Sequence, residues 1–215
     1  MITVKNVKAA DQDNAIAAVV RAFSADPAAR WMYPDSQQYW QHFPRFVKAF
    51  AGAAFEHGSA DFVEGYSAAA LWLPPGVHPD EGALSKLIQC TIPRGNQTDL
   101  FALLEQMDGY HPAEPHWYLP MIGVDPAHQG KGYGSALLQH ALARCDADEK
   151  LAYLESTSVK SLRLYERHGF ELLGTIQVGS SPPLFPMLRK PSSSKVIRKR
   201  SSLASKKSTN PQASA

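Results

Sequence analysis

Residues 123–142 read GVDPAHQGKGYGSALLQHAL, and this stretch decides the fold. Three glycines, Gly130, Gly132 and Gly134, alternate with other residues just before a run whose apolar residues recur at helical spacing. Glycine adopts backbone conformations that other residues avoid and lets a ligand approach the main chain closely. A glycine loop that opens a helix offers successive N–H groups and the positive end of the helix dipole. The stretch therefore predicts a site for phosphate groups.

The glycine spacing separates the possible phosphate ligands. A Walker A loop requires GxxxxGK[ST], whereas here Lys131 precedes the second glycine and no Ser or Thr follows it directly. A dinucleotide fingerprint requires GxGxxG and an acidic residue about twenty positions later. The spacing here is GxGxG, although Glu155 lies at about that distance and keeps this alternative open. A helix start whose glycines serve only a turn is the structural alternative.

The segments around the loop predict alternating strands and helices. Trp117–Val124 is apolar and rich in aromatic and β-branched residues, so we expect a central strand, with a bulge or splayed edge at Pro120. Downstream we expect a helix over Ser135–Arg144, a strand over Leu151–Glu155, and a helix over Ser158–Arg167 closed by Gly169. An antiparallel strand pair, Glu171–Val178 and Leu184–Leu188, follows. These elements predict a mixed α/β domain.

The first half of the chain has weaker signals. ITVKNV near the N-terminus predicts a strand, and Asp11 is placed to cap a helix that Asp26-Pro27 closes. An amphipathic stretch from Ser36 to His57 is expected to be interrupted, or to start late, at Pro44. The remaining predicted elements are a hairpin around Gly65 and two helices, Glu81–Cys90 and Gln97–Met107.

Composition predicts one globular domain over residues 1–190. The 215 residues are 44% hydrophobic and 20% charged, and no apolar run approaches the length of a membrane span. The N-terminus lacks the apolar core of a secretory signal, so we expect a cytoplasmic protein. Cys90 and Cys145 have no CxxC spacing, which predicts two partly buried thiols rather than a disulfide framework or a zinc site.

Charge is distributed unevenly along the chain. Seven of the 22 Lys and Arg residues lie from Lys190 onward, where no acid occurs, so residues 1–189 carry 15 basic side chains against 20 acidic ones. An acidic body is a poor partner for nucleic acid and tolerates a cationic small molecule. Residues 191–215 are rich in Ser and Lys and poor in large apolar residues, which predicts a disordered basic tail.

The segment Val124–Gly134 resembles the V-x-P-x-x-Q/R-G-x-G-x-G/A signature of GNAT-type N-acetyltransferases. Leu154-Glu155 and the helix end Leu164–Phe170 resemble further marks of that family, and the resemblance is strong from about residue 111 to 170. Within the family, residues 114–134 and 165–170 are most similar to puromycin N-acetyltransferases. The resemblance implies the α/β GNAT fold: a mixed, mostly antiparallel sheet flanked by helices, with a splayed central strand.

The resemblance also implies the reaction. A primary amine attacks the thioester of acetyl-CoA directly and takes over its acetyl group, with acetyl-CoA as cosubstrate and without a metal. Backbone groups of Ile122, Gly123 and Val124 would hold the pantetheine arm. The pyrophosphate would lie against the amides of the loop, which comprises Gln129, Gly130, Lys131, Gly132, Tyr133, Gly134 and Ser135.

Two residues are the candidate catalytic groups. By the same resemblance, Tyr165 would protonate the departing CoA thiolate; the alternative is a helix tyrosine that only packs on the sheet. Glu155, at the end of the Leu151–Leu154 strand, is the first candidate to take the proton of the amine; the alternative is a carboxylate that makes a structural hydrogen bond. Glu114, or a water chain with no dedicated base, is an alternative to Glu155. His116, His128 and His168 are weaker candidates for the base.

Two positions depart from the family pattern. Ser161 stands where the family commonly has an Asn that contacts CoA, so a weakened contact is expected, with Arg163 free to reach a phosphate. Asp26-Pro27 differs from the puromycin enzymes beside the expected acceptor pocket, so the acceptor does not carry over.

Aromatic residues concentrate in the first half of the chain, where they would either line an acceptor cleft or fill the core: Trp31, Tyr33, Tyr39, Trp40, Phe43 and Trp72. The expected partner is a small amine with an apolar or aromatic part. We expect binding to neither nucleic acid nor membrane, and the protein is expected to be a monomer or a homodimer. Acetylation of a protein N-terminus or lysine, and a non-catalytic CoA-binding module, are the alternative functions.

Overall fold

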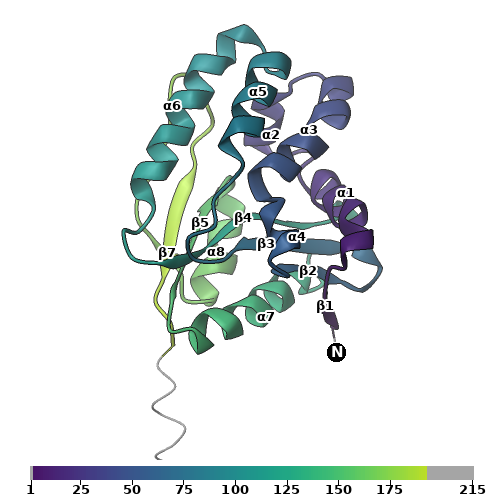
Figure 1. Ribbon diagram of the computed structural model, residues 1–215, viewed down its shortest axis with the longest axis vertical. Helices are drawn as coiled ribbons and strands as arrows, with labels where there is room; N and C mark the ends of the chain where they lie inside the picture. Colours follow the sequence, from purple (N-terminus) through teal and green to yellow (C-terminus); the bar gives the residue numbers. More distant parts are fainter. Residues whose placement is uncertain (1, 193–215) are drawn as a thin grey trace, which may run out of the picture.

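The computed structural model describes residues 2–192 and contains one seven-stranded sheet (Figure 1). The strand order is β1-β2-β3-β4-β5-β7-β6, and every neighbouring pair is antiparallel except β4 and β5, which are parallel. The strands are β1 (Val4–Asn6), β2 (Ala60–Val63), β3 (Ala68–Leu73), β4 (His116–Val124), β5 (Leu151–Ser156), β6 (Glu171–Leu172) and β7 (Phe185–Arg189).

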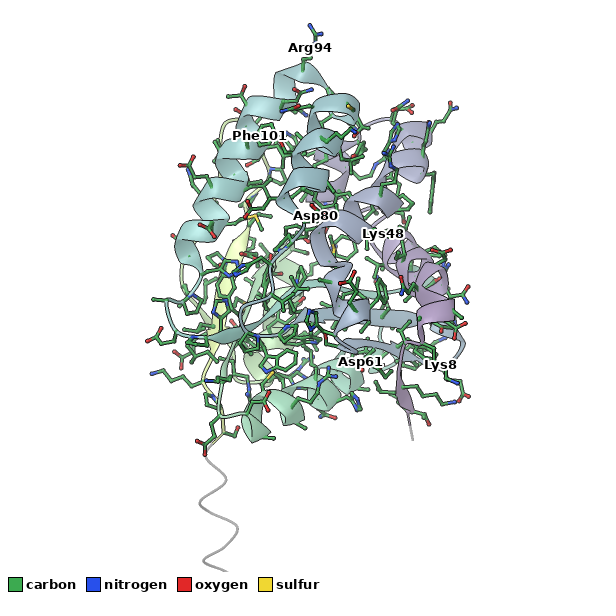
Figure 2. The ribbon with its side chains drawn as sticks, in the orientation of Figure 1. Lys8, Lys48, Asp61, Asp80, Arg94 and Phe101 are labelled. Carbon is green, nitrogen blue, oxygen red and sulfur yellow. The ribbon has the colours of Figure 1, made fainter. Side chains whose placement is uncertain are left out.

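Helices cover both faces of this sheet (Figure 1). One face carries α1 (Gln12–Ala22), α2 (Pro27–Met32), α3 (Ser36–Ala51), α4 (Ala53–Glu56), α5 (Glu81–Thr91) and α6 (Arg94–Tyr110). The other carries α7 (Tyr133–Ala147) and α8 (Val159–Arg167). The α5–α6 hairpin extends away from the sheet, and Arg94 lies at its far end (Figure 2). Within residues 2–192, no helix is both long and apolar enough to cross a membrane.

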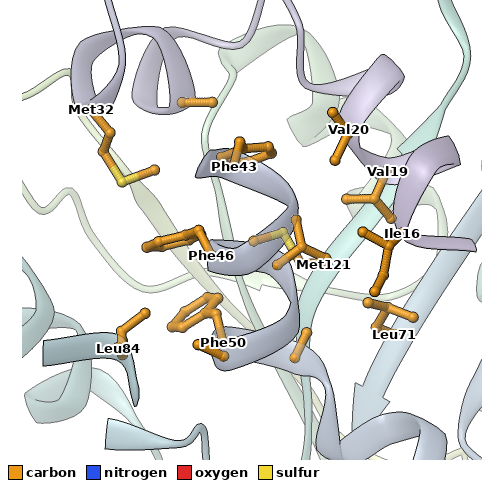
Figure 3. Close-up of a cluster of buried hydrophobic side chains, with 14 of the residues drawn as sticks. Ile16, Val19, Val20, Met32, Phe43, Phe46, Phe50, Leu71, Leu84 and Met121 are labelled. Carbon is orange, nitrogen blue, oxygen red and sulfur yellow. The ribbon is translucent and has the colours of Figure 1, made fainter. Parts of the chain in front are cut away.

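The larger core lies under α3, whose aromatic side chains form a ladder. The rings of Phe43 and Phe46 stack with centroids 5.7 Å apart, and those of Phe46 and Phe50 are 5.5 Å apart (Figure 3). The helix continues through Pro44, so the predicted interruption or late start there is wrong. An interior proline costs a helix about 3 kcal/mol, whereas each buried aromatic side chain contributes about 1.5–3 kcal/mol. Burial of the aromatic face therefore outweighs the cost of the proline.

The predicted start of α1 at Asp11 is confirmed in position, whereas its predicted end is wrong. Asp11 occupies the N-cap position, but its side chain makes no capping hydrogen bond. The helix ends at Ala22, and Asp26-Pro27 begins α2 instead of closing α1. The Asp26 carboxylate accepts hydrogen bonds from the N–H groups of Ala28 and Ala29 at 2.9 and 3.0 Å. Proline at the first helical position suits this arrangement because its fixed φ is already helical.

The central strand β4 contains the irregularity that Pro120 predicted. Its register with β3 shifts between the pairs Leu71↔Met121 and Leu73↔Tyr118, which places a bulge at residues 119–120. Pairing of β4 with β5 stops at Tyr118↔Tyr153, two residues before the proline. Beyond that point the two parallel strands separate, and the separation opens the sheet for the site described below.

Ion pairs tie α7 to the rest of the fold. Asp61, labelled in Figure 2, lies on β2. It is fully buried and accepts a 2.6 Å hydrogen bond from Arg144. Arg189 on β7 holds both carboxylate oxygens of Asp146 at 2.7 and 2.9 Å. These contacts join the C-terminal end of α7 to two strands on opposite sides of the central strand β4.

Two further predictions concern the cysteines and the tail. Cys145 is buried, and burial raises the pKa of its thiol to about 12, whereas Cys90 is exposed rather than partly buried. The expected basic tail lies, from residue 193 onward, outside the described residues.

Candidate active site

The glycine loop adopts the conformation that its sequence predicts. Gly130 and Gly132 have φ of +77° and +84°, a region that favours glycine. Gly132 is the N-cap of α7 and supplies no side-chain acceptor, so the loop exposes the first-turn N–H groups of the helix to a ligand. Gly134 allows close packing, because a Cβ there would lie 3.3 Å from Leu164 Cδ2 and 3.7 Å from Val124 Cγ2.

Hydrogen bonds fix this loop to the end of β4. Gln129 Nε2 donates to the Val124 carbonyl at 3.3 Å. Asp125 accepts from Arg21 Nε on α1 at 2.8 Å and from the Ala127 N–H at 3.0 Å. Gly123 meets α1 directly, since a Cβ there would lie 2.5 Å from Ala22 Cβ. The loop is thus held in place before any ligand arrives.

A cleft of about 510 Å³ runs along the loop between β4, β5, α7 and α8, and we call it the glycine-loop cleft. Of the eleven predicted cofactor contacts, ten line it: Ile122, Gly123, Val124, Gln129, Gly130, Gly132, Tyr133, Gly134, Ser135 and Ser161. The Lys131 residue does not line the cleft, nor does Arg163, whose side chain is exposed on α8.

Two basic residues that sequence reasoning missed, Lys160 and Arg167, do line this cleft. The spacing of these two residues would have predicted their place in the cleft. Residues seven apart in a helix lie on one face, and the same face of α8 carries Leu164, which packs against the glycine loop.

Tyr165 also lines the glycine-loop cleft. Its ring is 7% exposed and packs edge-to-face on Phe170, with centroids 6.0 Å apart. Burial raises the pKa of the Tyr165 phenol, and the negative charge of Asp26 raises it further. The hydroxyl is therefore protonated at neutral pH, as a proton donor must be.

A second, smaller space of about 70 Å³ adjoins the cleft on the α3 side of the sheet, and we call it the apolar pocket. Phe43, Phe46, Phe50, Met32 and Met121 form much of its wall (Figure 3). The cleft and the pocket share five lining residues: Phe23, Asp26, Pro120, Glu155 and Thr157.

The predicted aromatic lining is partly realised. Trp31 and Phe43 line the apolar pocket. The other four do not: Tyr33, Tyr39 and Trp72 are fully buried in the core, and Trp40 is 51% exposed.

Asp26 places one carboxylate at the junction of cleft and pocket. Besides capping α2, it accepts a hydrogen bond from the Thr157 hydroxyl at the end of β5. Burial raises the pKa of Asp26, and the hydrogen bonds from Thr157 and α2 oppose this rise. Sequence reasoning treated Asp26 as part of the acceptor border but gave it no chemical role.

Glu155 places a second carboxylate at the same junction. Its side chain is 3% exposed, and Oε1 has no hydrogen-bond partner within the described part of the chain. His111 is one of its ionisable neighbours, with Nε2 3.5 Å from Oε1. Burial and the charge of Glu155 raise the pKa values of the neighbouring Tyr118 and Tyr153 phenols.

The alternative bases are less well placed. The Glu114 side chain is exposed and lines neither space, and His128 is also absent from both linings. His168 shares a 2.8 Å hydrogen bond with the Ser135 hydroxyl at the helix start. His116 faces a third cavity, described below.

Comparison with known proteins agrees with this geometry. Residues 96–170 match the sequence model of the Acetyltransferase (GNAT) family. An uncharacterized N-acetyltransferase of Schizosaccharomyces pombe is 26% identical over 210 residues, covering 87% of this chain and 83% of its own.

Solved structures share the fold over nearly the whole chain. A protein described as histone acetyltransferase HPA2 and related acetyltransferase, from Corynebacterium glutamicum, is 28% identical with a TM-score of 0.64, covering 91% of this chain and 99% of its own. Arylalkylamine N-acetyltransferase 2 from Aedes aegypti is 13% identical with a TM-score of 0.62, covering 89% and 99%. Residues 96–170 therefore match the GNAT acetyltransferase family, and the chain is an acyltransferase with the GNAT fold.

Proposed function

We propose that the chain acetylates the primary amine of a small molecule that has an apolar or aromatic part, with acetyl-CoA as the acetyl donor. One observation carries the proposal: the glycine-loop cleft and the apolar pocket meet where Asp26 and Glu155 both line the wall. A thioester entering from one side and an amine entering from the other would meet beside two carboxylates.

The residues of the glycine-loop cleft fit acetyl-CoA. The N–H groups that open α7 suit a pyrophosphate, and Lys160 and Arg167 add positive charge to the same cleft. The Ser161 hydroxyl offers one hydrogen bond where the family commonly has an amide. Ile122, Gly123 and Val124, the last residues of β4, would pair with the pantetheine arm after β5 has diverged. When bound, acetyl-CoA supplies the thioester whose acetyl group is transferred.

Glu155 and Tyr165 would manage the protons. An ammonium group is not a nucleophile, so Glu155 would take one proton from it. Tyr165 would give a proton to the sulfur that leaves. Val124 N–H would donate a hydrogen bond to the thioester oxygen; one such preorganised donor is typically worth about 3–4 kcal/mol.

The acceptor would be a cation with a compact apolar part. Asp26 and Glu155 attract an ammonium group, and the apolar pocket beyond them is closed by aromatic and methionine side chains. Methionine adapts its shape, so Met32 and Met121 would let the pocket widen for a ring. The name of the Aedes aegypti structural neighbour refers to arylalkylamines, a class with these two parts.

A thiol-release assay over a panel of amines tests the proposal. We expect release with alkyl and aryl-alkyl primary amines and little release with hydrophilic amines of equal charge. Melting in the presence of acetyl-CoA tests the cleft separately, because a ligand that binds only the folded state raises the melting temperature. Thermal stabilisation without release by any amine would favour a CoA-binding module. Release only with peptides would favour protein acetylation.

A further inference from the structure

Amine acetylation releases one proton, and the site must dispose of it. An ammonium and acetyl-CoA give an amide, free CoA thiol and one proton. In the proposed function that proton first rests on Glu155, whose side chain is 3% exposed. A base so buried needs a route to water before it can act again, and a bound acceptor and acetyl-CoA would fill the two spaces that it lines.

Two histidines form a chain that leads away from Glu155. Glu155 Oε1 lies 3.5 Å from His111 Nε2, and His111 Nδ1 lies 3.0 Å from His116 Nε2. His116 Nδ1 lies 2.9 Å from the Glu114 carbonyl oxygen. The first distance is slightly long for a hydrogen bond, as is common at sites without their substrates.

The backbone carbonyl at the end of this chain sets the direction of every proton in it. A carbonyl only accepts, so His116 Nδ1 carries the hydrogen and a neutral His116 has a lone pair on Nε2. His111 must then donate from Nδ1, which leaves its own Nε2 with a lone pair. That lone pair faces Glu155 Oε1. The pair is thus prepared to accept a proton from Glu155.

The chain ends at a third cavity, of about 610 Å³, which we call the histidine cavity. His111 and His116 both line it, on the far side of Tyr118 from the apolar pocket. The other titratable side chains that line it are His78 before α5, Glu81 on α5, Glu105 and Asp108 on α6, and Tyr118 on β4. Tyr153 and Glu155 on β5 contact His111 but do not line the cavity. The three carboxylic acids that line it, Glu81, Glu105 and Asp108, favour the arrival of a proton.

We propose that the His111–His116 pair carries the proton released by acetylation from Glu155 to water in the histidine cavity. Glu155 takes one proton from the ammonium, and the amine nitrogen then forms the C–N bond while the C–S bond breaks. The leaving sulfur takes the proton of Tyr165, and Tyr165 regains one from the acylated nitrogen, so that one proton remains on Glu155. Glu155 passes its proton to His111 Nε2, and the pair shares the extra proton as one imidazolium. His116 then gives one proton to water in the histidine cavity, which leaves the hydrogen of His111 on Nε2. Exchange of hydrogens with that water restores the starting tautomers.

The rings are held for this task. His111 packs against Tyr118 and Tyr153, with centroids 4.6 and 4.4 Å away. Burial lowers the pKa of His116, the charges of His111 and His78 lower it further, and the Glu114 carbonyl and Glu155 oppose this. An imidazole with a lowered pKa returns its proton to water readily.

The inference rests on the proposed function and is tested with the full-length protein and an amine that the wild type acetylates. His111→Ala removes the acceptor of the Glu155 proton, and His116→Asn interrupts the next contact. We expect kcat to fall about 10–100-fold in His111→Ala, with unchanged acetyl-CoA affinity, and to fall less in His116→Asn. Added imidazole should restore much of the His111→Ala rate in proportion to its unprotonated fraction. His57→Ala, on an exposed histidine outside the three spaces, is the control.

The outcomes separate the two proposals. No amine-dependent thiol release by the wild type refutes the proposed function. Wild-type activity together with an unaltered rate and pH profile in both variants refutes the relay and means that the proton leaves through the substrate spaces. If His111→Ala melts early, His116→Asn decides, because His116 is further from Glu155 and the same imidazole rescue and pH profile apply. A lower rate with neither imidazole rescue nor a changed pH profile also refutes the relay.

Discussion

Substitution of Glu155 by Gln gives the sharpest test of the proposed base. The amide preserves the size of a side chain that is 3% exposed and removes only its charge and its basicity. An alkylammonium with a pKa near that of lysine, about 10.4, is deprotonated in about one molecule in 10³ at pH 7.4. Without a base the enzyme would use only this fraction, so kcat/KM should fall about 10²–10³-fold.

The pH dependence of this variant distinguishes a lost base from a damaged site. The free-amine fraction rises tenfold per pH unit below the amine pKa, so Glu155→Gln should be about 100-fold faster at pH 9.4 than at 7.4. Thiol release measured from pH 6.5 to 9.5 is the assay, with melting in acetyl-CoA as the folding check. Glu114→Gln is the matched control because Glu114 is exposed and lines neither substrate space. Near-wild-type activity of Glu155→Gln at pH 7.4 would refute the reasoning.

Three other substitutions test separate parts of the fold and site. Tyr165→Phe keeps the packing on Phe170 and should lower kcat about 100-fold at unchanged acetyl-CoA affinity; equal turnover would remove the acid role. Gly132→Ala forces a Cβ into φ of +84°, at a cost of about 1–2 kcal/mol, and should weaken acetyl-CoA binding in calorimetry. Asp146→Asn breaks the pair with Arg189 and should cost about 1–3 kcal/mol of unfolding free energy in urea at pH 7. Arg189 lowers the pKa of Asp146 below its usual 3.8. The wild type therefore keeps the stabilisation from this ion pair above pH 3.8 and loses it as the pH falls through the lowered pKa. Asp146→Asn should show no such loss of stability on acidification.

Features set by local sequence could be predicted, and those set by tertiary contacts could not. The glycine loop was predictable because positive φ at Gly130 and Gly132 and the start of α7 depend on neighbouring residues. The bulge at Pro120 was predictable because proline lacks a backbone donor. Asp26 was misread as a stop signal, since an Asp-Pro pair closes one helix as readily as it opens another.

The histidine pair shows why the rest of the site was hidden. The sequence marks His116 as a candidate base on its own and gives no signal for His111, although the two are only five residues apart. Their significance depends on Glu155, which reaches them only because β5 pairs in parallel with β4. No helical or strand periodicity reports such a contact across the sheet.

The divergence of β4 and β5 explains why the candidate base is buried at the point where two substrates would meet. The strands pair through Tyr118↔Tyr153 and then separate, and the first residues past this point include Pro120 and Glu155, which line both the cleft and the apolar pocket. A carboxylate two residues further back would lie within the paired sheet and reach no substrate. One placed well beyond the divergence would be solvated and would need no relay. At residue 155 it reaches both spaces, and His111 approaches it from beside the last paired tyrosines, so the same geometry accounts for the access of substrates and for a separate proton exit.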